Sequence, residues 1–173
     1  MNKIIIYKEV RVPIGNHEGK RIIIGADHRG FNCKNKVIKN LEERGYTILD
    51  IGTFSPERCD YPYISDEIGK KVSEDRDYNT VGIGICGSGI GILIPASKYK
   101  GIYAARCLTP KEAETSRKHN NTNVLGLGAD CTDLETAIRT VFSWLETQFY
   151  TDPEKEENYL ERYVQTVKLE NQE

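Results

Sequence analysis

The chain has 173 residues, of which 38% are hydrophobic and 29% charged, and its formal net charge is -2. This length suits one ordinary domain, and the composition is typical of a folded, water-soluble protein. The sequence shows no apolar run of the roughly 18 residues that span a bilayer. It also shows no signal-peptide pattern and no basic excess of the kind that nucleic-acid binders carry. We therefore expect a cytoplasmic enzyme or small-molecule binder, with neither membrane nor nucleic acid as a partner.

Cysteine and histidine spacing bears on redox and metal chemistry. The five cysteines are odd in number and include no C-x-x-C pair, which argues against a disulfide framework and a zinc ribbon. His17, His28 and His119 are too far apart to form a histidine-based metal motif. We accordingly expect no metal and no cofactor.

The predicted elements begin with an extension. Residues 1–20 predict a strand or hairpin ahead of the main domain, which we place at 21–150. The aliphatic run at 21–25 predicts a buried strand. The apolar spacing over 31–44, closed by Gly45, predicts an amphipathic helix.

The same alternation continues to residue 150. Further strands are predicted at 46–51, 81–85, 102–107 and 124–127. Further helices are predicted at 62–75, at 90–99, after the N-cap Thr109, and at 133–150. Strand and helix in alternation, five times over, indicate an α/β fold with a five-stranded parallel sheet and helices on both faces. Ligands of such sheets bind at the carboxyl ends of the strands.

Residues 151–173 form a C-terminal segment outside this pattern. They open with an acidic run and then show helical apolar spacing through Tyr159, Tyr163 and Val167. We expect this helical segment to pack on a partner subunit.

Glycines crowd the stretch from Gly82 to Ile92. The formal G-x-G-x-x-G match at Gly82, Gly84 and Gly87 is interpreted as accidental, because a dinucleotide fingerprint needs its first glycines in the turn after the strand. The glycines within the turn are Gly87, Gly89 and Gly91.

These turn glycines follow Cys86 at the predicted end of a strand. Unblocked N–H groups there form an anion-binding nest, aided by the start of the next helix, and such a nest favours the thiolate form of a nearby cysteine. Cys86 is thus a candidate base beside an oxyanion site. The alternative is a buried structural cysteine followed by a tight turn.

Two other segments carry polar groups. Asp27, His28 and Arg29 follow the first strand of the domain, where Asp27 could instead simply cap the next helix. Residues 117–123 include His119 and could equally be an ordinary polar loop. We expect all three segments to meet at one edge of the sheet. Such a set suits proton abstraction next to a carbonyl through an enediolate.

Four motifs in register carry a resemblance to a known family. They are Gly25-Ala-Asp-His-Arg-Gly-Phe31, Asp50-Ile-Gly-Thr53 with Asp60-Tyr-Pro62, Ile85-Cys-Gly-Ser-Gly-Ile-Gly91, and Ser116-Arg-Lys-His-Asn-Asn-Thr-Asn-Val-Leu125. Over about residues 21–150 the chain resembles ribose-5-phosphate isomerase B, whose wider group includes the galactose-6-phosphate isomerase subunits. The resemblance implies a Rossmann-like three-layer sandwich and metal-free aldose–ketose isomerisation of a sugar phosphate. It also implies a homodimer, or a dimer of dimers, whose active sites use both subunits.

The resemblance also implies roles for individual residues. Cys86 matches the catalytic base that moves a proton between C1 and C2, and Ser88 lies near that proton path. His119 matches the histidine that opens the sugar ring. The residues that match substrate-binding positions are Asp27, His28, Gly87, Gly89, Gly91 and Asn120.

The chain departs from the family pattern where an arginine usually binds phosphate. Asp130 stands at one such position, and only Arg162 matches one arginine of the usual C-terminal pair. Arg29 and Arg106 stand where the family more often has small residues, and either could rebuild a phosphate site. Two alternatives follow: the same isomerisation on another sugar or sugar phosphate, or a sugar-binding module without catalysis.

Overall fold

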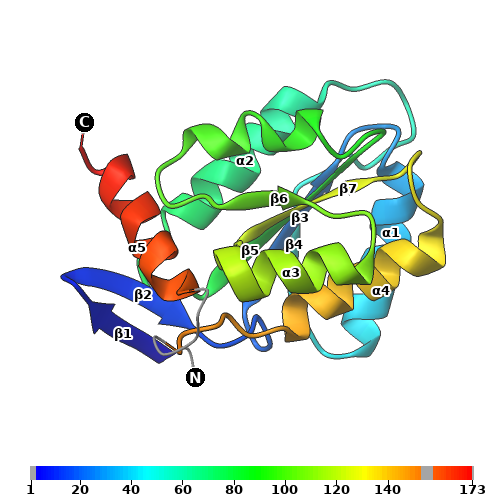
Figure 1. Cartoon of the computed structure of the whole chain (residues 1–173). Helices are drawn as coiled ribbons and strands as arrows, with labels where there is room; N and C mark the ends of the chain where they lie inside the picture. Colours follow the sequence, from blue (N-terminus) through cyan, green and yellow to red (C-terminus); the bar gives the residue numbers. More distant parts are fainter. Residues whose placement is uncertain (1–2, 153–157, 173) are drawn as a thin grey trace.

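Five parallel strands form the central sheet of the computed structural model, which describes residues 3–152 and 158–172. Across the sheet they follow the order β4-β3-β5-β7-β6 (Figure 1). Their bounds are Arg21–Ala26 for β3, Thr47–Asp50 for β4, Thr80–Cys86 for β5, Ala104–Arg106 for β6 and Val124–Gly128 for β7. The predicted α/β class with a five-stranded parallel sheet is confirmed.

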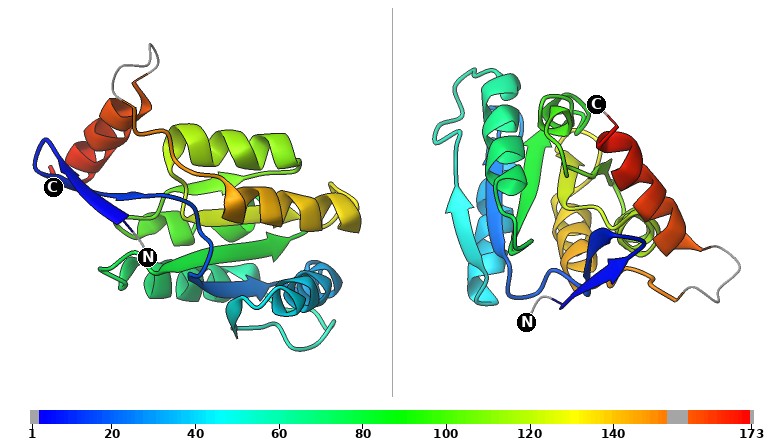
Figure 2. Two further views of the ribbon diagram at one scale, coloured as in Figure 1. Left: turned by 90° about the horizontal axis from the view of Figure 1, so that it is seen from below. Right: turned by 90° about the vertical axis from the view of Figure 1, so that its left-hand side faces the viewer.

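Helices cover both faces of the sheet, so the molecule has three layers (Figure 2). One face carries α1 (Phe31–Glu43), α3 (Pro110–Asn120) and α4 (Leu134–Glu146), and the other carries α2 (Tyr61–Ser73). Alternation along β3 explains the two cores, because Ile22 and Ile24 join the first while Ile23 joins the second. All three side chains are fully buried.

Glycines inside β5 allow the second face to pack closely. A Cβ at Gly82 would lie 2.6 Å from the Ile68 side chain of α2, and one at Gly84 would lie 2.7 Å from Ile92. Both glycines lie within the strand, as expected. Their role is to seat neighbouring elements on the sheet, so the structure supports the interpretation that the dinucleotide motif is accidental.

Two predicted helices differ in the structure. In place of a helix over 90–99 there are two short 3-10 turns, η1 (Gly91–Leu93) and η2 (Ala96–Lys98). Pro95 lies between them and has no N–H with which to continue an α-helix. The helix predicted over 133–150 ends at Glu146, and the chain then runs extended so that Phe149 reaches a separate apolar cluster.

That cluster joins the two ends of the chain. Strands β1 (Lys3–Tyr7) and β2 (Val10–Ile14) form an antiparallel hairpin, separate from the main sheet, and helix α5 (Tyr159–Glu170) packs against it. The buried members are Val12, Phe149, Tyr159, Leu160, Tyr163 and Val164. The hairpin and the C-terminal helix are confirmed, and α5 packs on the chain's own hairpin, while its docking on a partner subunit stays a prediction. The acidic run predicted before this helix lies largely outside the described residues.

The described residues contain neither a membrane-spanning helix nor a cluster of metal-binding side chains. No helix among them is both long and apolar enough to cross a membrane. No group of three or more His, Cys, Asp or Glu side chains within residues 3–152 and 158–172 is placed to hold a metal ion.

Candidate active site

Cys86 ends the central strand β5 and is buried, with 4% of its surface exposed. The N–H of Gly89 donates to its Sγ atom at 3.2 Å. Gly89 has a φ of +74°, which L side chains rarely adopt, so glycine at this position allows the loop to fold back over the thiol. The N–H groups of Gly87 and Ser88 donate to no acceptor among the described residues. The loop therefore presents unused donors beside a sulfur atom, although no α-helix begins there to assist them.

The other cysteines include two with a raised pKa. All five are free thiols. Burial raises the pKa of Cys33 and that of Cys107 to about 11, which keeps both as thiols near neutral pH. Neither of them lies in the glycine-rich loop.

Asp27 lies directly beside the Cys86 loop, because its own N–H donates to the carbonyl oxygen of Ile85 at 3.1 Å. It is buried, and its Oδ1 atom accepts N–H groups from Arg29 at 2.9 Å and Gly30 at 3.1 Å. These bonds organise the turn that leads into α1. The Oδ2 atom makes no hydrogen bond to any described residue. Asp27 thus serves the turn and still has an acceptor to offer a hydroxyl group.

His28 points toward the loop that follows β4. Its Nδ1 atom lies 3.1 Å from the carbonyl oxygen of Cys59 and 3.4 Å from the backbone nitrogen of the same residue. The contact holds the imidazole, which is partly exposed, at the carboxyl end of the sheet.

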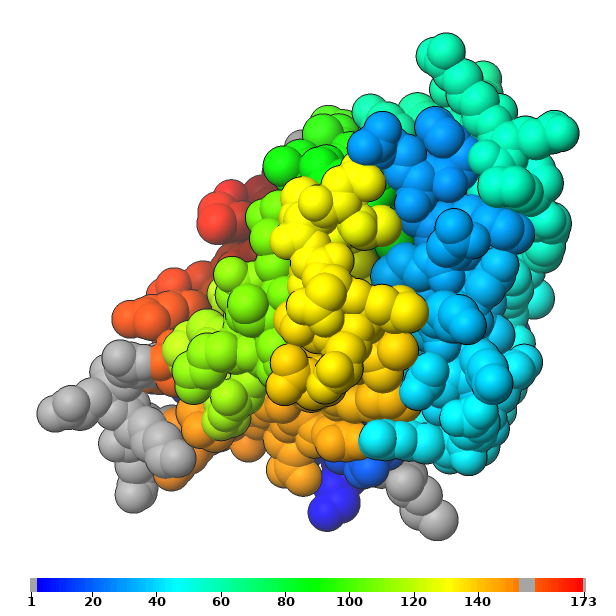
Figure 3. Space-filling view, turned by 90° about the vertical axis from the view of Figure 1, so that its right-hand side faces the viewer, coloured from blue at the N-terminus to red at the C-terminus, as the bar shows by residue number. Residues whose placement is uncertain are grey.

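Arg29 and Asp130 form an ion pair above the glycine-rich loop. Arg29 Nε donates to Asp130 Oδ2 at 2.6 Å, and Nη2 lies 2.5 Å from the same oxygen. A Cβ at Gly87 would lie 2.5 Å from that oxygen, so the pair rests directly on this glycine. Figure 3 shows the segments that carry the two residues, blue and yellow, meeting on the surface at this end of the molecule. The acid at the family's arginine position therefore engages the extra arginine of this chain.

Ser88 and Arg106 complete the rim. Ser88 is exposed, its hydroxyl accepts the N–H of Ile90 at 3.2 Å, and Arg106 Nε donates to its carbonyl oxygen at 2.7 Å. Gly91 lies under Tyr61, since a Cβ there would be 2.8 Å from the tyrosine ring. The loops after β3, β5 and β7, together with Arg106 at the end of β6, thus meet around the glycine-rich loop that follows Cys86.

The expectation that residues 117–123 join this edge of the sheet is wrong. Gly82 pairs with Val124 and Cys86 with Gly128, so a segment that ends just before Val124 lies at the amino end of the strands. Figure 1 shows the carboxyl ends of β5 and β7 on one side and the last turn of α3 on the other. The physical reason is the direction of a parallel sheet: the loop that precedes a strand lies at the opposite end from the loop that follows it. His119 and Asn120 are therefore far along the sheet from Cys86 of the same chain.

His119 instead lines a cavity of about 470 Å³ at the amino end of the edge strand β6. Its ring stacks on Tyr159 of α5, with centroids 4.1 Å apart and planes 6° from parallel. Asn120 and Arg162 line the same cavity, and the Arg162 guanidinium lies 5.7 Å from the centroid of the Tyr159 ring. The structure thus brings His119, Asn120 and Arg162 together. Tyr159 was missed as a site residue, because its apolar spacing in a helix indicated only packing.

Two separate clusters of polar groups result, one at each end of the sheet. The carboxyl end of the sheet supplies a thiol, unused N–H donors and a free carboxylate oxygen, and the amino end supplies an imidazole and a guanidinium. A thiolate next to fixed N–H groups suits proton removal from a carbon adjacent to a carbonyl, because the donors stabilise the oxyanion that forms.

Comparisons with known proteins give this geometry a context. The sequence model of the ribose/galactose isomerase family matches residues 22–161. Ribose-5-phosphate isomerase B of Escherichia coli is 42% identical over 130 residues, which are 75% of this chain and 86% of that protein. D-erythrulose-4-phosphate isomerase of Pectobacterium atrosepticum is 34% identical over 130 residues, covering 74% and 84%.

Among solved structures, ribose-5-phosphate isomerase B of Mycoplasma genitalium with bound ribulose-5-phosphate superposes with a TM-score of 0.81 at 28% identity. The superposition covers 88% of this chain and 97% of that one. With a matched profile over most of its length and relatives of this identity, the chain belongs to the ribose/galactose isomerase family.

Proposed function

We propose that this aldose–ketose isomerase interconverts a sugar phosphate pair of the ribose 5-phosphate and ribulose 5-phosphate type through an enediolate, without a metal. The observation that carries the proposal is the buried Cys86 thiol under the Gly89 N–H, with the Gly87 and Ser88 N–H groups unused. The names of the relatives support this substrate class.

The chemistry follows from the groups at the carboxyl end of the sheet. Cys86 as thiolate takes the proton from C2 of the open-chain aldose, and the electron pair moves toward the C1 oxygen. The loop N–H groups stabilise the negative charge that develops on that oxygen. The Cys86 thiol then returns a proton to C1, while a proton moves from the C2 hydroxyl to the C1 oxygen. Ser88 is assigned to assist this second transfer, and Asp27 Oδ2 is assigned to accept a hydrogen bond from a hydroxyl of the substrate.

We further propose that each site is built from two subunits. His119 is assigned to opening the sugar ring, with Asn120 beside it, yet both lie at the opposite end of the sheet from Cys86 of their own chain. A two-fold symmetric dimer resolves this separation, because it places the amino-end cavity of one chain against the carboxyl-end loop of the other. The surface near the β6 edge fits an interface, since Ile90 and Ile94 beside it are each 53% exposed.

The ion pair between Arg29 and Asp130 bears on which substrate the site accepts. Arg29 is held by a carboxylate, which places negative charge beside the loop. Arg162 in the His119 cavity then becomes the arginine best placed to meet a phosphate. The erythrulose phosphate relative favours testing a shorter sugar phosphate as a second candidate.

The test of the chemistry is Cys86→Ala. We expect kcat/KM to fall by at least about a hundredfold, since general-base catalysis is lost, while the unfolding midpoint changes little. Exchange of the C2 proton with solvent, followed by NMR, isolates the proton-transfer step. Near-normal exchange in the variant would rule Cys86 out as the base. Cys131→Ala, an exposed thiol nearby, is the matched control.

The test of the substrate is a panel of four- to six-carbon aldose phosphates, with the unphosphorylated sugars alongside. Ribose 5-phosphate is expected to give the highest kcat/KM. A shorter phosphate or a free sugar turned over at least tenfold better would replace it. Binding of every sugar with no turnover would instead favour a non-catalytic module.

A further inference from the structure

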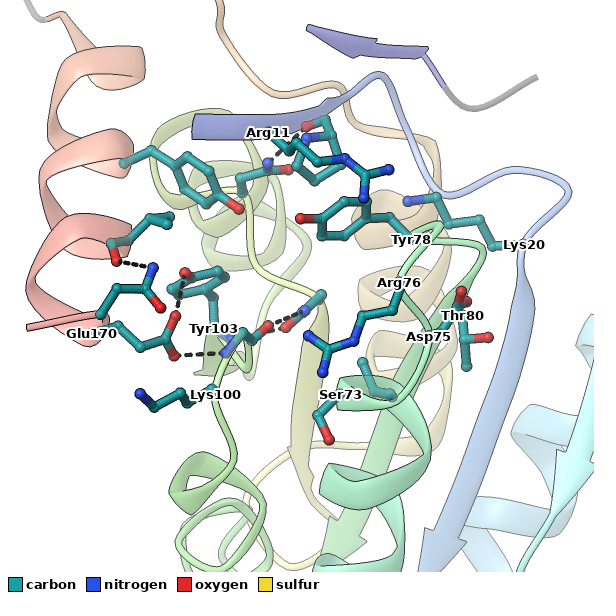
Figure 4. Close-up of a pocket in the computed structure, with 18 residues that line it drawn as sticks. Arg11, Lys20, Ser73, Asp75, Arg76, Tyr78, Thr80, Lys100, Tyr103 and Glu170 are labelled. Carbon is teal, nitrogen blue, oxygen red and sulfur yellow. Dashed lines mark hydrogen bonds between the residues drawn. The ribbon is translucent and has the colours of Figure 1, made fainter. Parts of the chain in front are cut away.

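A separate cavity of about 210 Å³ lies at the amino end of the sheet, enclosed by β2, α5, the loop after α2 and the loop before β6 (Figure 4). A single water molecule needs only about 10–15 Å³ of such space, so the cavity has room for a small molecule. It holds neither Cys86 nor His119. Part of its wall comes from Arg11 and Lys20, which lie outside the residues matched by the family profile.

Four cationic and two acidic side chains line this cavity among the described residues. The cations are Arg11, Lys20, Arg76 and Lys100, and the acids are Asp75 and Glu170. Glu170 is already engaged, because it accepts the N–H of Gly101 at 2.6 Å and the hydroxyl of Tyr103 at 3.1 Å. Arg76 and Lys100 form no ion pair with any described residue. The lining therefore carries an excess of unsatisfied positive charge.

Lys20 is the strongest sign of a built site. Only 7% of the surface of this residue is exposed. Its Nζ atom has no acceptor within hydrogen-bond distance in the described part of the chain, and Figure 4 shows it directed toward the other lining residues. Burial lowers the pKa of Lys20 to about 8, with nearby Arg117 adding to the effect and Asp75 opposing it. A lysine enclosed to this extent, whose ammonium makes no hydrogen bond within the described residues, favours the binding of an anion.

Asp75 supplies the opposite kind of vacant group. Its Oδ1 atom accepts the N–H of Asp77 at 3.0 Å, but Oδ2 is buried and has no hydrogen-bond partner among the described residues. Lys20 and Asp75 do not form an ion pair with each other, although both line the cavity. A ligand that satisfies both must combine an anionic group with a hydroxyl donor.

We propose that this cavity binds a small phosphomonoester that carries hydroxyl groups, at a second site distinct from the isomerase site. The phosphate meets Lys20 and Arg76, and a hydroxyl donates to Asp75. Tyr103 and Tyr163 line this cavity and also the one that holds His119. Their rings meet edge to face with centroids 5.1 Å apart. A ligand here therefore touches the wall of the cavity that holds His119 without entering that cavity.

Isothermal titration calorimetry on the full chain tests the proposal, with glycerol 2-phosphate as the probe and inorganic phosphate and glycerol as separate arms. We expect one glycerol 2-phosphate per chain at this cavity, weaker binding of inorganic phosphate, and none of glycerol. Lys20→Met keeps the length of the buried side chain and removes the charge. It is expected to weaken binding at least about tenfold, because a charge-assisted hydrogen bond is lost.

Arg76→Gln is the second variant, since Arg76 is exposed and its replacement does not disturb the core. Lys36→Met, an exposed lysine on α1, is the matched control and should bind as the wild type does. Arg162→Gln, which removes the arginine proposed to meet the substrate phosphate, should also bind glycerol 2-phosphate as the wild type does, which separates this site from the isomerase site even if the proposed reaction is wrong. Equal binding by wild type, Lys20→Met and Arg76→Gln, or no binding by the wild type, would overturn the proposal.

Discussion

Two buried polar residues, His17 and Arg117, hold the loop that follows His119. Arg117 is 1% exposed and donates to Asn121 Oδ1 at 2.9 Å, to the Thr122 carbonyl at 2.7 Å and to the Gly15 carbonyl at 3.0 Å. His17 Nε2 lies 2.9 Å from the same Thr122 carbonyl. These hydrogen bonds favour one geometry, because a slip would leave the buried Arg117 charge without its acceptors. His17 Nδ1 is buried and has no hydrogen-bond partner among the described residues. The loop that follows His119 is thus tied to the segment that links the hairpin to the sheet.

His17 leads to a prediction on pH. Burial, together with the charge of Arg117, keeps the pKa of His17 well below its usual value of 6.5. Below pH 6.5 the unfolded chain therefore binds a proton that the native chain refuses, and the free energy of unfolding falls by up to about 1.4 kcal/mol per pH unit. Above pH 6.5 neither state binds that proton, so this dependence vanishes.

Urea denaturation of wild type and His17→Gln between pH 4.5 and 7.5 measures the effect. The difference between the two free energies of unfolding should be constant above pH 6.5. It should shrink as the pH falls below 6.5, because only the wild type loses this stabilisation. Parallel curves down to pH 4.5 would contradict the assignment.

The hairpin and α5 form a supporting unit at the element scale. They share one apolar cluster, and α5 carries both Tyr159, which stacks on His119, and Arg162. The extended segment after α4 contributes Phe149 to the same cluster. Packing of the two chain ends therefore positions the residues of the amino-end cavity.

Val12→Ala tests this support. Val12 is fully buried between the hairpin and α5, so truncation should reduce the free energy of unfolding by about 2 kcal/mol. Ile6→Ala, on the same hairpin but 68% exposed, should change it by less than about 0.5 kcal/mol. Urea denaturation followed by circular dichroism gives both values. Equal losses in the two variants would mean that the hairpin does not pack as described.

Prediction from the sequence succeeded for elements whose signals are local. The apolar periodicity and Gly45 defined α1 to within a residue, and Thr109 does cap α3 by accepting the N–H of Glu112. The prediction of a helix over 90–99 failed, because it followed the apolar spacing and gave too little weight to the break that Pro95 imposes. The ion pair between Arg29 and Asp130 could not be predicted, since it joins residues 101 apart that only the sheet brings together.

At the scale of the whole molecule, Cys86 and His119 lie at opposite ends of one sheet. The sequence motifs named both as candidates, but the prediction that their segments meet at one edge was wrong, because residues 117–123 precede β7 and so lie at the amino end of the strands. The isomerisation proposed above uses the thiol at one end and the imidazole at the other. We therefore propose that catalysis needs two copies of this chain.

Complementation between Cys86→Ala and His119→Gln tests that claim most directly. Each variant alone should lose at least about a hundredfold in kcat/KM. Co-expressed with different affinity tags and purified through both, every mixed dimer would hold one site with both residues intact and one with neither. Such dimers should recover about half of the wild-type activity. Activity no higher than that of the separate variants would contradict a site shared between subunits.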